Sequence, residues 1–425
     1  MRTTVVLAVA LLALRPGLSA QESPGTSRLS IDEAVAEALA RNLTMQTERA
    51  RLPLADALRM TAGLRPNPVL SFSSDHLDLA GYGFTEENGG GPAEFSVRTD
   101  YLWEQAGKRR RRQDVADREG TVMRHQVADA ARLLAYEVRS AFIDLQLAQQ
   151  TIALAQENLT AMQRVEQVSG ARVRSGDLAE VEAMRTRVAV RQIENEVRLR
   201  ELARRTAQRR LNLLMGRPAD AGAIDAAGAF EPAGAPVPPE SDVERAALAS
   251  RPDLQALIAD GARSEADLLL QRSIGRVDFT LGTEFRRQQG LNGRSNSLGF
   301  FASTPLPVFD RNQGEVARAR VDVNLAARRV EVLRASIAHE VREAYDHHQT
   351  ARALLEQIEN KMLTDAREVR SITEYAYQRG EASLVELLDA QRAFNETMES
   401  HLGAQAECAR SRYLIDAVSG KGDYR

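Results

Sequence analysis

The chain has 425 residues, 27% of them charged, and a net charge of −3 at pH 7. Mean hydropathy is −0.35, which excludes a bundle of apolar membrane-spanning helices. The near-neutral charge excludes no partner class by itself but gives no indication of nucleic-acid binding. The basic run at residues 108–112 fits a solvated or lipid-headgroup-facing cluster better than a nucleic-acid patch. Cys408 is the only cysteine, so one chain can form neither a disulfide framework nor a cysteine metal site.

The first twenty residues have the three-part layout of a secretory signal peptide. Arg2 supplies positive charge, an apolar run covers residues 5–14, and small residues lead to Ala20. The apolar run is too short for the alternative, a membrane anchor, because about 20 residues are needed to cross a bilayer. We expect residues 1–20 to be a signal peptide and the exported chain to begin near Gln21.

The remainder of the chain is a tandem duplication. The run AYEVRSAF at residues 135–142 returns as AHEVREAY at residues 338–345. Between the two copies lies a segment rich in alanine, glycine and proline, which is typical of a linker. The sequence therefore predicts a first repeat over residues 21–216, a linker over residues 217–240, a second repeat over residues 241–420 and a tail over residues 421–425.

Each repeat is expected to open with a capped helix. Ser30 and Glu33 have the spacing of a capping box, in which the serine caps the helix and the glutamate reaches back to the main chain. Ser241 and Glu244 have the same spacing at the start of the second repeat. The pattern predicts the same helix start twice.

Four short stretches alternate between apolar and polar residues, as half-buried strands do. The predicted strands are residues 69–74, 95–101, 278–285 and 297–304, with loops at residues 81–92 and 288–296. Four amphipathic strands cannot close a barrel in lipid, because about eight strands are the minimum and open edges leave backbone groups unpaired. The chain is therefore expected to oligomerise, and three copies would bring twelve strands together.

Long helices follow each strand pair. Apolar residues, many of them alanine, recur at steps of three and four without an intervening proline, which indicates heptads and close helix packing. A glycine turn then reverses the chain into a second helix, so that each repeat yields a long helical hairpin. The predicted helices are residues 112–169 and 177–215 in the first repeat, and a seam at residues 337–362 followed by a helix at residues 382–418 in the second.

The duplicated plan and two paired motifs resemble the TolC family of outer-membrane efflux proteins over the whole exported chain. The motifs are VRSGDLAEVE at residues 173–182 and YQRGEASLVELLDA at residues 377–390. The resemblance implies a mainly α protein with a small β part. Its duplicated long α-helical hairpins would form a trimeric α-barrel that crosses the periplasm, and its four strands would contribute to a shared 12-stranded outer-membrane β-barrel. The far end of the α-barrel would meet a periplasmic adaptor protein and an inner-membrane pump, for which the resemblance implies the resistance nodulation division type.

The resemblance also assigns the hairpin turns. Gly176 and Gly380 would lie at the periplasmic tip, where the chain reverses. The exposed groups that an adaptor would contact there are Arg174, Ser175, Arg379 and Ser383. The alternative is that these are ordinary solvent-facing turn residues.

A periplasmic gate is the second site that the resemblance implies. Glu386 and Asp389 would share one helix face, and threefold symmetry would make each a ring of carboxylates that attracts cations. Tyr377 and Glu182 are candidate partners in the links that hold the entrance shut. Ala382 departs from the family, since some members carry a basic residue there, so the closing network must differ. A solvated charged face is the alternative for the two acids.

The segment LWEQAGKR at residues 102–109 is similar to the strand end of the heavy-metal efflux branch. This similarity favours metal cations as cargo, although the segment does not contain a substrate site. Basic residues at a helix start oppose the helix dipole, so a lipid phosphate is a candidate partner for them.

No enzyme chemistry is found in the sequence. The six histidines do not form a two-ligand spacing with a carboxylate or cysteine, and no serine elbow, phosphate loop or dinucleotide fingerprint is present. His347 and His348 invite a metal interpretation, but His348 takes the seam position of Leu145 and is expected to be packed or interfacial. We expect no catalytic residue, no cofactor and no resident metal.

Two further alternatives were weighed. An exported trimeric coiled-coil stalk or adhesin accounts for the heptads but not for four strands placed identically in two repeats. A general porin would devote most of its length to strands. The sequence therefore favours an outer-membrane efflux channel with a long periplasmic extension, which passively conducts substrate handed over by an adaptor and a pump.

Overall fold

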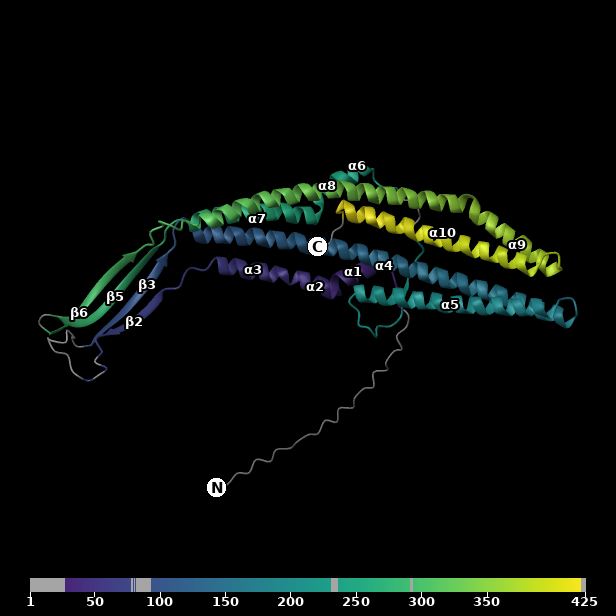
Figure 1. The fold of residues 1–425 in the computed structure, drawn as a ribbon, viewed down its shortest axis with the longest axis horizontal. Helices are drawn as coiled ribbons and strands as arrows, with labels where there is room; N and C mark the ends of the chain where they lie inside the picture. The colour runs from purple at the N-terminus through teal and green to yellow at the C-terminus, as the bar shows by residue number, and fades with distance from the viewer. Residues whose placement is uncertain are drawn as a thin grey trace, which may run out of the picture.

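The computed structural model describes residues 27–77, 79, 81, 93–230, 236–290 and 293–421. These residues form an elongated molecule with a sheet at one end and two helical turns at the other (Figure 1). The expected signal peptide lies outside the described residues, as do nearly all of the predicted loop at residues 81–92 and of the tail. Among the described residues, no helix combines the length and apolar character that crossing a membrane requires.

The first repeat contains three short helices, two strands and one hairpin of long helices. Its elements are α1 (Ile31–Arg41), α2 (Leu43–Arg49), α3 (Arg51–Ala62), β2 (Val69–Asp75), β3 (Glu94–Trp103), α4 (Lys108–Arg174) and α5 (Glu180–Leu214). The long helix α4 extends beyond both predicted bounds and runs without interruption for 67 residues.

The second repeat has the same order of elements with two differences, since two helices replace the first three and the counterpart of α4 is divided. Its elements are α6 (Glu240–Ser250), α7 (Pro252–Ile274), β5 (Phe279–Gly290), β6 (Gly293–Ser303), α8 (Gln313–Gln357), the π-helical η1 (Ile358–Met362), α9 (Leu363–Arg379) and α10 (Leu384–Ser419). The π-helical segment η1 divides what is one continuous helix in the first repeat, and the chain bends toward α10 on the α9 side of it (Figure 1).

The sheet joins the two repeats in the order β2-β3-β5-β6, and all three strand pairs are antiparallel. The four predicted strands are confirmed. The predicted loop at residues 288–296 is wrong, because β5 continues to Gly290 and β6 resumes at Gly293 in register with it. Gly290 pairs with Gly293, and Arg287 pairs with Asn296, so these residues belong to the strand hairpin.

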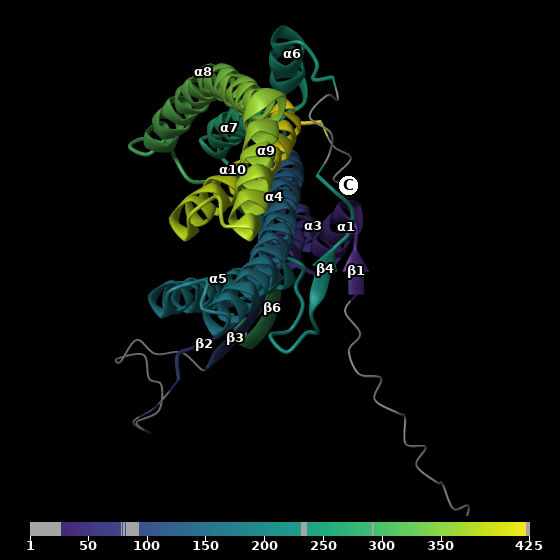
Figure 2. The same cartoon turned by 90° about the vertical axis from the view of Figure 1, so that its right-hand side faces the viewer.

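A second, two-stranded sheet was not predicted. The strand β1 (Ser27–Leu29) pairs in parallel with β4 (Ile224–Ala226), which lies inside the predicted linker. Seen along the long axis, this pair and α6 lie beside the long helices (Figure 2). Gln149 of α4 anchors the pair, since its amide group donates to Asp225 over 2.8 Å and accepts from the main chain of Ala226 over 3.2 Å.

The core lies halfway along the helices, where α1 and α5 pack on α4. The predicted seam of α4 is buried there, with Val138 and Leu145 fully inaccessible beside Ala38 and Leu211. The duplicate position Val341 is equally buried in the corresponding cluster of the second repeat. Both repeats therefore use the same stripe as core, and the architecture is mainly α with a small β part, built from duplicated hairpins.

The two predicted capping boxes have different outcomes. Ser30 accepts from the main-chain N–H of Glu33, and Glu33 accepts in return from Ser30, so the first box is confirmed. The second box, Ser241 with Glu244, is wrong, because α6 begins two residues earlier than the box implies, with Pro239 at its N-cap position and no side-chain cap. Proline fixes the chain for a helix start and places Ser241 inside the first turn.

Candidate functional site at the hairpin turns

The predicted turn glycines reverse the chain at the end of the molecule remote from the four-stranded sheet. Gly176 follows α4 with φ of 81°, and Gly380 follows α9 with φ of 80°, a conformation that L side chains rarely adopt. The residue after each glycine donates its N–H to the carbonyl five residues before it. These bonds run from Asp177 to Arg172 and from Glu381 to Ala376. Glycine at these positions therefore produces both turns.

The two turns differ in how the descending helix begins. Ser383 and Glu386 form a capping box at the start of α10, with a 2.7 Å bond from the N–H of Ser383 to Glu386. The duplicate position of Ser383 is Ala179, which has no side chain that can cap α5. Glu182, the duplicate of Glu386, instead forms an ion pair of 2.8 Å with Arg185. In the first turn the glutamate therefore pairs with an arginine, whereas in the second turn the glutamate caps the helix.

The predicted gate acids are both exposed, but only Asp389 is free of helix-capping bonds. Hydrogen bonds from the main chain and then the hydroxyl of Ser383 lower the pKa of Glu386. Asp389 lies one turn further along α10, where its closest basic group is Arg392 at 3.5 Å, and its side chain is 64% exposed. The carboxylate of Glu386 is therefore engaged at the helix start, whereas that of Asp389 is not.

Tyr377 is the buried member of the predicted gate. Its ring is 3% exposed and packs with Leu384 and Leu387 of α10. Its hydroxyl lies 2.9 Å from that of Ser169 on α4, so it joins the second hairpin to the first. Within one chain the structure does not bring Tyr377 and Glu182 together.

The predicted contact residues lie at the surface of the turns. Arg174 is exposed, Ser175 donates its hydroxyl to Asp177 over 2.7 Å, and the guanidinium of Arg379 stacks on the ring of Tyr375. Ser383 is also exposed, but its hydroxyl is engaged in the capping box. The resemblance placed these residues at the turns, and their position at the surface leaves them accessible to a partner.

Sequence reasoning missed two residues that connect the hairpins. Ser169 is fully buried beside Tyr377, and Arg172 lies between the two turns, with its guanidinium 3.2 Å from where a Cβ on Gly380 would be. The heptad step from Met162 leads directly to residue 169, so a polar residue in that seam was the available signal.

The histidine pair does not form a metal centre. His348 is buried and bonds Ser411 over 3.0 Å, while His347 lies 3.4 Å from Glu407. Burial, and next the charges of Arg352 and Arg412, lower the pKa of His348. Within the part of the chain that the structure describes, no three histidine, cysteine or acidic residues are grouped so as to hold a metal ion. His348 is therefore packed, as its seam position predicted.

Two repeats that each carry a strand pair and a long helical hairpin define the architecture of the chain. A family described as "Outer membrane efflux protein" matches residues 34–217 and 244–421, one match for each repeat. The chain belongs to this family, and the resemblance seen in the sequence is confirmed.

Relatives with this architecture span the whole chain at low identity. The cobalt-zinc-cadmium resistance protein CzcC of Cupriavidus metallidurans is 22% identical over 432 residues, covering 99% of this chain and 100% of its own. The nodulation protein T of Rhizobium leguminosarum bv. trifolii is 23% identical, covering 91% of this chain and 85% of its own. A crystal structure of CusC, described in terms of folding and transmembrane channel formation, superposes with a TM-score of 0.76 at 16% identity over 97% of this chain and 100% of that one.

Proposed function

We propose that three copies of this chain form the outer-membrane channel of a tripartite efflux assembly in a Gram-negative envelope. The observation that carries the proposal is the two-faced sheet at one end of the hairpins. The side chains of Phe72, Val97, Phe285 and Leu298 lie side by side across the four strands, and all four are exposed. A row of exposed apolar side chains is suited to lipid.

The opposite face of the same sheet is charged. Arg98 binds Asp100 at 2.9 Å, and Arg286 binds Glu284 at 2.8 Å on the neighbouring strand. Successive residues along each strand therefore alternate between a face suited to lipid and a face of ion pairs. This is the alternation of a channel wall with a polar interior. A stalk or adhesin has no use for this alternation.

Incomplete edges support a homotrimer. The strands β2 and β6 are the outer strands of the sheet and have unpaired backbone groups. The outer helix of each hairpin also carries an exposed apolar stripe. The stripes comprise Val181, Met184 and Val188 on α5, and Val369, Ile372 and Tyr375 on α9. Three copies that joined edge to edge would close the sheets and cover these stripes in one arrangement.

The proposed mechanism is passive. A periplasmic adaptor would contact the turns through Arg174, Ser175, Arg379 and Ser383, and an inner-membrane pump of the resistance nodulation division type would supply the energy. Substrate would then diffuse through the water-filled tube, past the outer-membrane lipid, to the exterior. The chain would act as a conduit with no catalytic residue and no cofactor.

The proposed gate is formed where the turns of three copies meet. Asp389 and Glu386 would provide rings of carboxylates at the entrance, which favour cations. Tyr377 would hold the second hairpin against the first through Ser169. Glu182 would remain in reach of the neighbouring turn through its pairing with Arg185.

We propose divalent metal cations as the cargo. The support is the whole-length similarity to a cobalt-zinc-cadmium resistance protein together with the acidic entrance. This assignment is separate from the channel function, because a passive duct does not select its cargo as a pump does.

The test is growth of a pump-competent Gram-negative strain that lacks its own copy of this component. Growth is compared with and without the gene across cobalt, zinc, cadmium and a set of hydrophobic drugs. Rescue against the metals supports the whole proposal, and rescue against drugs alone corrects the cargo. Absence of any rescue, although trimers reach the outer membrane, would contradict the efflux function.

Two matched variants separate channel function from folding. Phe285→Lys introduces a charge on the apolar face and is expected to cost up to about 4 kcal/mol in lipid, which prevents insertion. Arg286→Gln changes the adjacent residue on the opposite face and is expected to insert and to rescue growth. Equal rescue by both variants would contradict the assignment of the faces.

A further inference from the structure

The basic run that begins α4 is divided by the structure into two groups. Lys108 is buried, and its ammonium group donates to the carboxylate of Asp278 over 2.6 Å. Arg109 donates to the main-chain carbonyl of Gly63 over 2.6 Å. These two side chains join α4 to the neighbouring β5 and α3 regions, so they serve the fold.

The remaining three residues of the run do not behave alike. Arg112 binds both carboxylate oxygens of Glu104, at 2.5 and 2.9 Å. The side chains of Arg110 and Arg111, called the arginine pair below, have no hydrogen bond or ion pair to any residue that the structure describes. Two adjacent guanidinium groups without an anion raise each other's electrostatic energy and oppose the dipole of a 67-residue helix.

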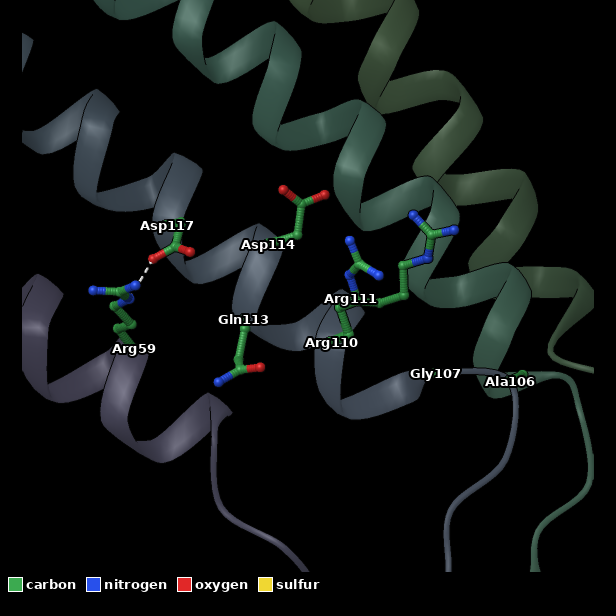
Figure 3. A pocket seen from close by; sticks show the side chains of 8 residues that line it. All are labelled: Arg59, Ala106, Gly107, Arg110, Arg111, Gln113, Asp114 and Asp117. Carbon is green, nitrogen blue, oxygen red and sulfur yellow. Dashed lines mark ion pairs between the residues drawn. The ribbon is translucent and has the colours of Figure 1, made fainter.

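The arginine pair borders a hollow of about 680 Å³ beside the first turns of α4 (Figure 3). Two acids also line this hollow, but each already has a cation. Asp117 binds Arg59 at 2.6 Å, as the dashed line shows, and Asp114 binds Arg118 at 3.2 Å. The hollow therefore offers positive charge that the protein itself does not neutralise.

The hollow lies immediately next to the part of the molecule that is suited to lipid. Gly107, the N-cap residue of α4, lies only four residues after Trp103 at the end of β3, and Trp103 is 56% exposed. Phe279, Leu306 and Phe309 are also exposed at this end of the sheet. Exposed aromatic side chains followed directly by arginines are typical of a membrane interface, where rings lie at the headgroup level and cations reach phosphates.

We propose that the arginine pair binds the headgroup phosphate of an anionic phospholipid in the leaflet that faces the helices. Guanidinium groups bind phosphate oxygens through paired hydrogen bonds, and adjacent residues on one turn can share a single headgroup. The inference rests on the proposed function in one respect, since it takes the sheet to lie in a membrane. It adds a defined lipid site that would fix how deep the channel lies.

Trp103 provides a direct readout, because it is the only tryptophan in the chain. The full-length protein in dodecyl maltoside micelles is titrated with phosphatidylglycerol that carries bromine on its acyl chains, and quenching of tryptophan fluorescence is recorded. Arg110→Gln with Arg111→Gln is expected to raise the half-quenching lipid fraction by about tenfold. Arg110→Lys with Arg111→Lys should keep most of the affinity.

The control is Arg187→Gln with Arg198→Gln on α5, which removes two exposed arginines without a described partner far from the sheet. It is expected to leave quenching unchanged, and circular dichroism checks that all variants keep their helices. An equal loss in this control would overturn the site, as would identical curves for the glutamine pair and the parent protein. Competition by millimolar inorganic phosphate would also overturn it, because the ligand would then be a free anion. The assay requires no pump, so failed export with intact lipid binding, or the reverse, tells the two proposals apart.

Discussion

The hydroxyl oxygens of Tyr377 and Ser169 lie 2.9 Å apart, and both side chains are buried between the two hairpins. This side-chain hydrogen bond joins α4 of the first repeat to α9 of the second. It lies within two turns of Gly176 and close to Gly380, where the hairpins end.

Tyr377→Phe removes this bond while keeping the packed ring. The expected cost is about 1 kcal/mol, which corresponds to roughly fivefold faster exchange of local amides. Hydrogen exchange with mass spectrometry over α9 and the last turns of α4 measures it. Tyr375→Phe is the matched control, since Tyr375 is 55% exposed, and no change is expected there. Unaltered exchange in Tyr377→Phe would show that the bond does not hold the hairpins together.

Asp389→Asn is expected to weaken block of the channel by a multivalent cation about tenfold in planar bilayers, because a threefold ring loses three charges. Glu386→Gln is expected to have a smaller effect, since donors from Ser383 already neutralise part of that carboxylate's field. Single-channel recordings with hexaamminecobalt provide the comparison. Unchanged block in both variants would identify the acids as solvated surface groups, and an equal change in both would contradict the smaller role expected for Glu386.

The capping box of α10 is expected to depend on pH. Hydrogen bonds from Ser383 lower the pKa of Glu386 in the folded chain, so the box contributes stability above the ordinary glutamate value of about 4.3. That contribution is lost as the pH falls through the lower, folded pKa. Amide protection of residues 384–388, corrected for intrinsic exchange, should therefore drop below pH 4.

Two internal comparisons test this interpretation. Glu33 has the same capping bonds with Ser30 and a lowered pKa, so the start of α1 should respond in the same way. The start of α5 at Ala179 has no side-chain cap and should show no such step. A step of equal size at all three helix starts would assign the effect to general acid unfolding.

The ion pair of Lys108 with Asp278 connects the sheet ends of the two repeats. Asp278→Asn leaves a buried ammonium group with only a neutral partner and is expected to cost about 3 kcal/mol. The exposed pair of Arg59 with Asp117 is the control, and Asp117→Asn should cost less than about 1 kcal/mol. The midpoint of guanidinium unfolding in detergent compares them, and equal costs would contradict the importance of burial.

Periodic features were predictable from the sequence. Alternation located β2 and β3 to within two residues, and heptads located α4 and α5 because a repeated stripe must be buried. The turn glycines followed from a similar logic, since the chain has to reverse between two helices of one hairpin. Both turns have the positive φ that only glycine adopts easily.

Features without a period were not predictable. The pairing of β1 with β4 involves three residues at the start of the first repeat and three in the predicted linker, and such short segments carry no pattern. The π-helical turn η1 was also missed, and its additional residue shifts the apolar stripe by one position. Leu363 is buried where the predicted seam had Met362, which is 45% exposed. In both cases tertiary packing decides the local backbone conformation.

The capping role of Glu386 was open to prediction as well. Ser383 and Glu386 have the same spacing as Ser30 and Glu33, so the capping box was visible in the sequence. The family resemblance concerns only the charge of Glu386, so it did not predict the cap. The structure shows that its carboxylate closes the helix start as well.

The different helix starts after Gly176 and Gly380 affect any partner that approaches the end of the tube. A ring of three copies would present six turns, but they would alternate between one whose glutamate binds an arginine and one whose glutamate is held by a serine. A partner with six identical subunits would meet two kinds of surface. Its copies would be forced into alternating, unequal contacts, and each interface could then change by mutation without altering the other.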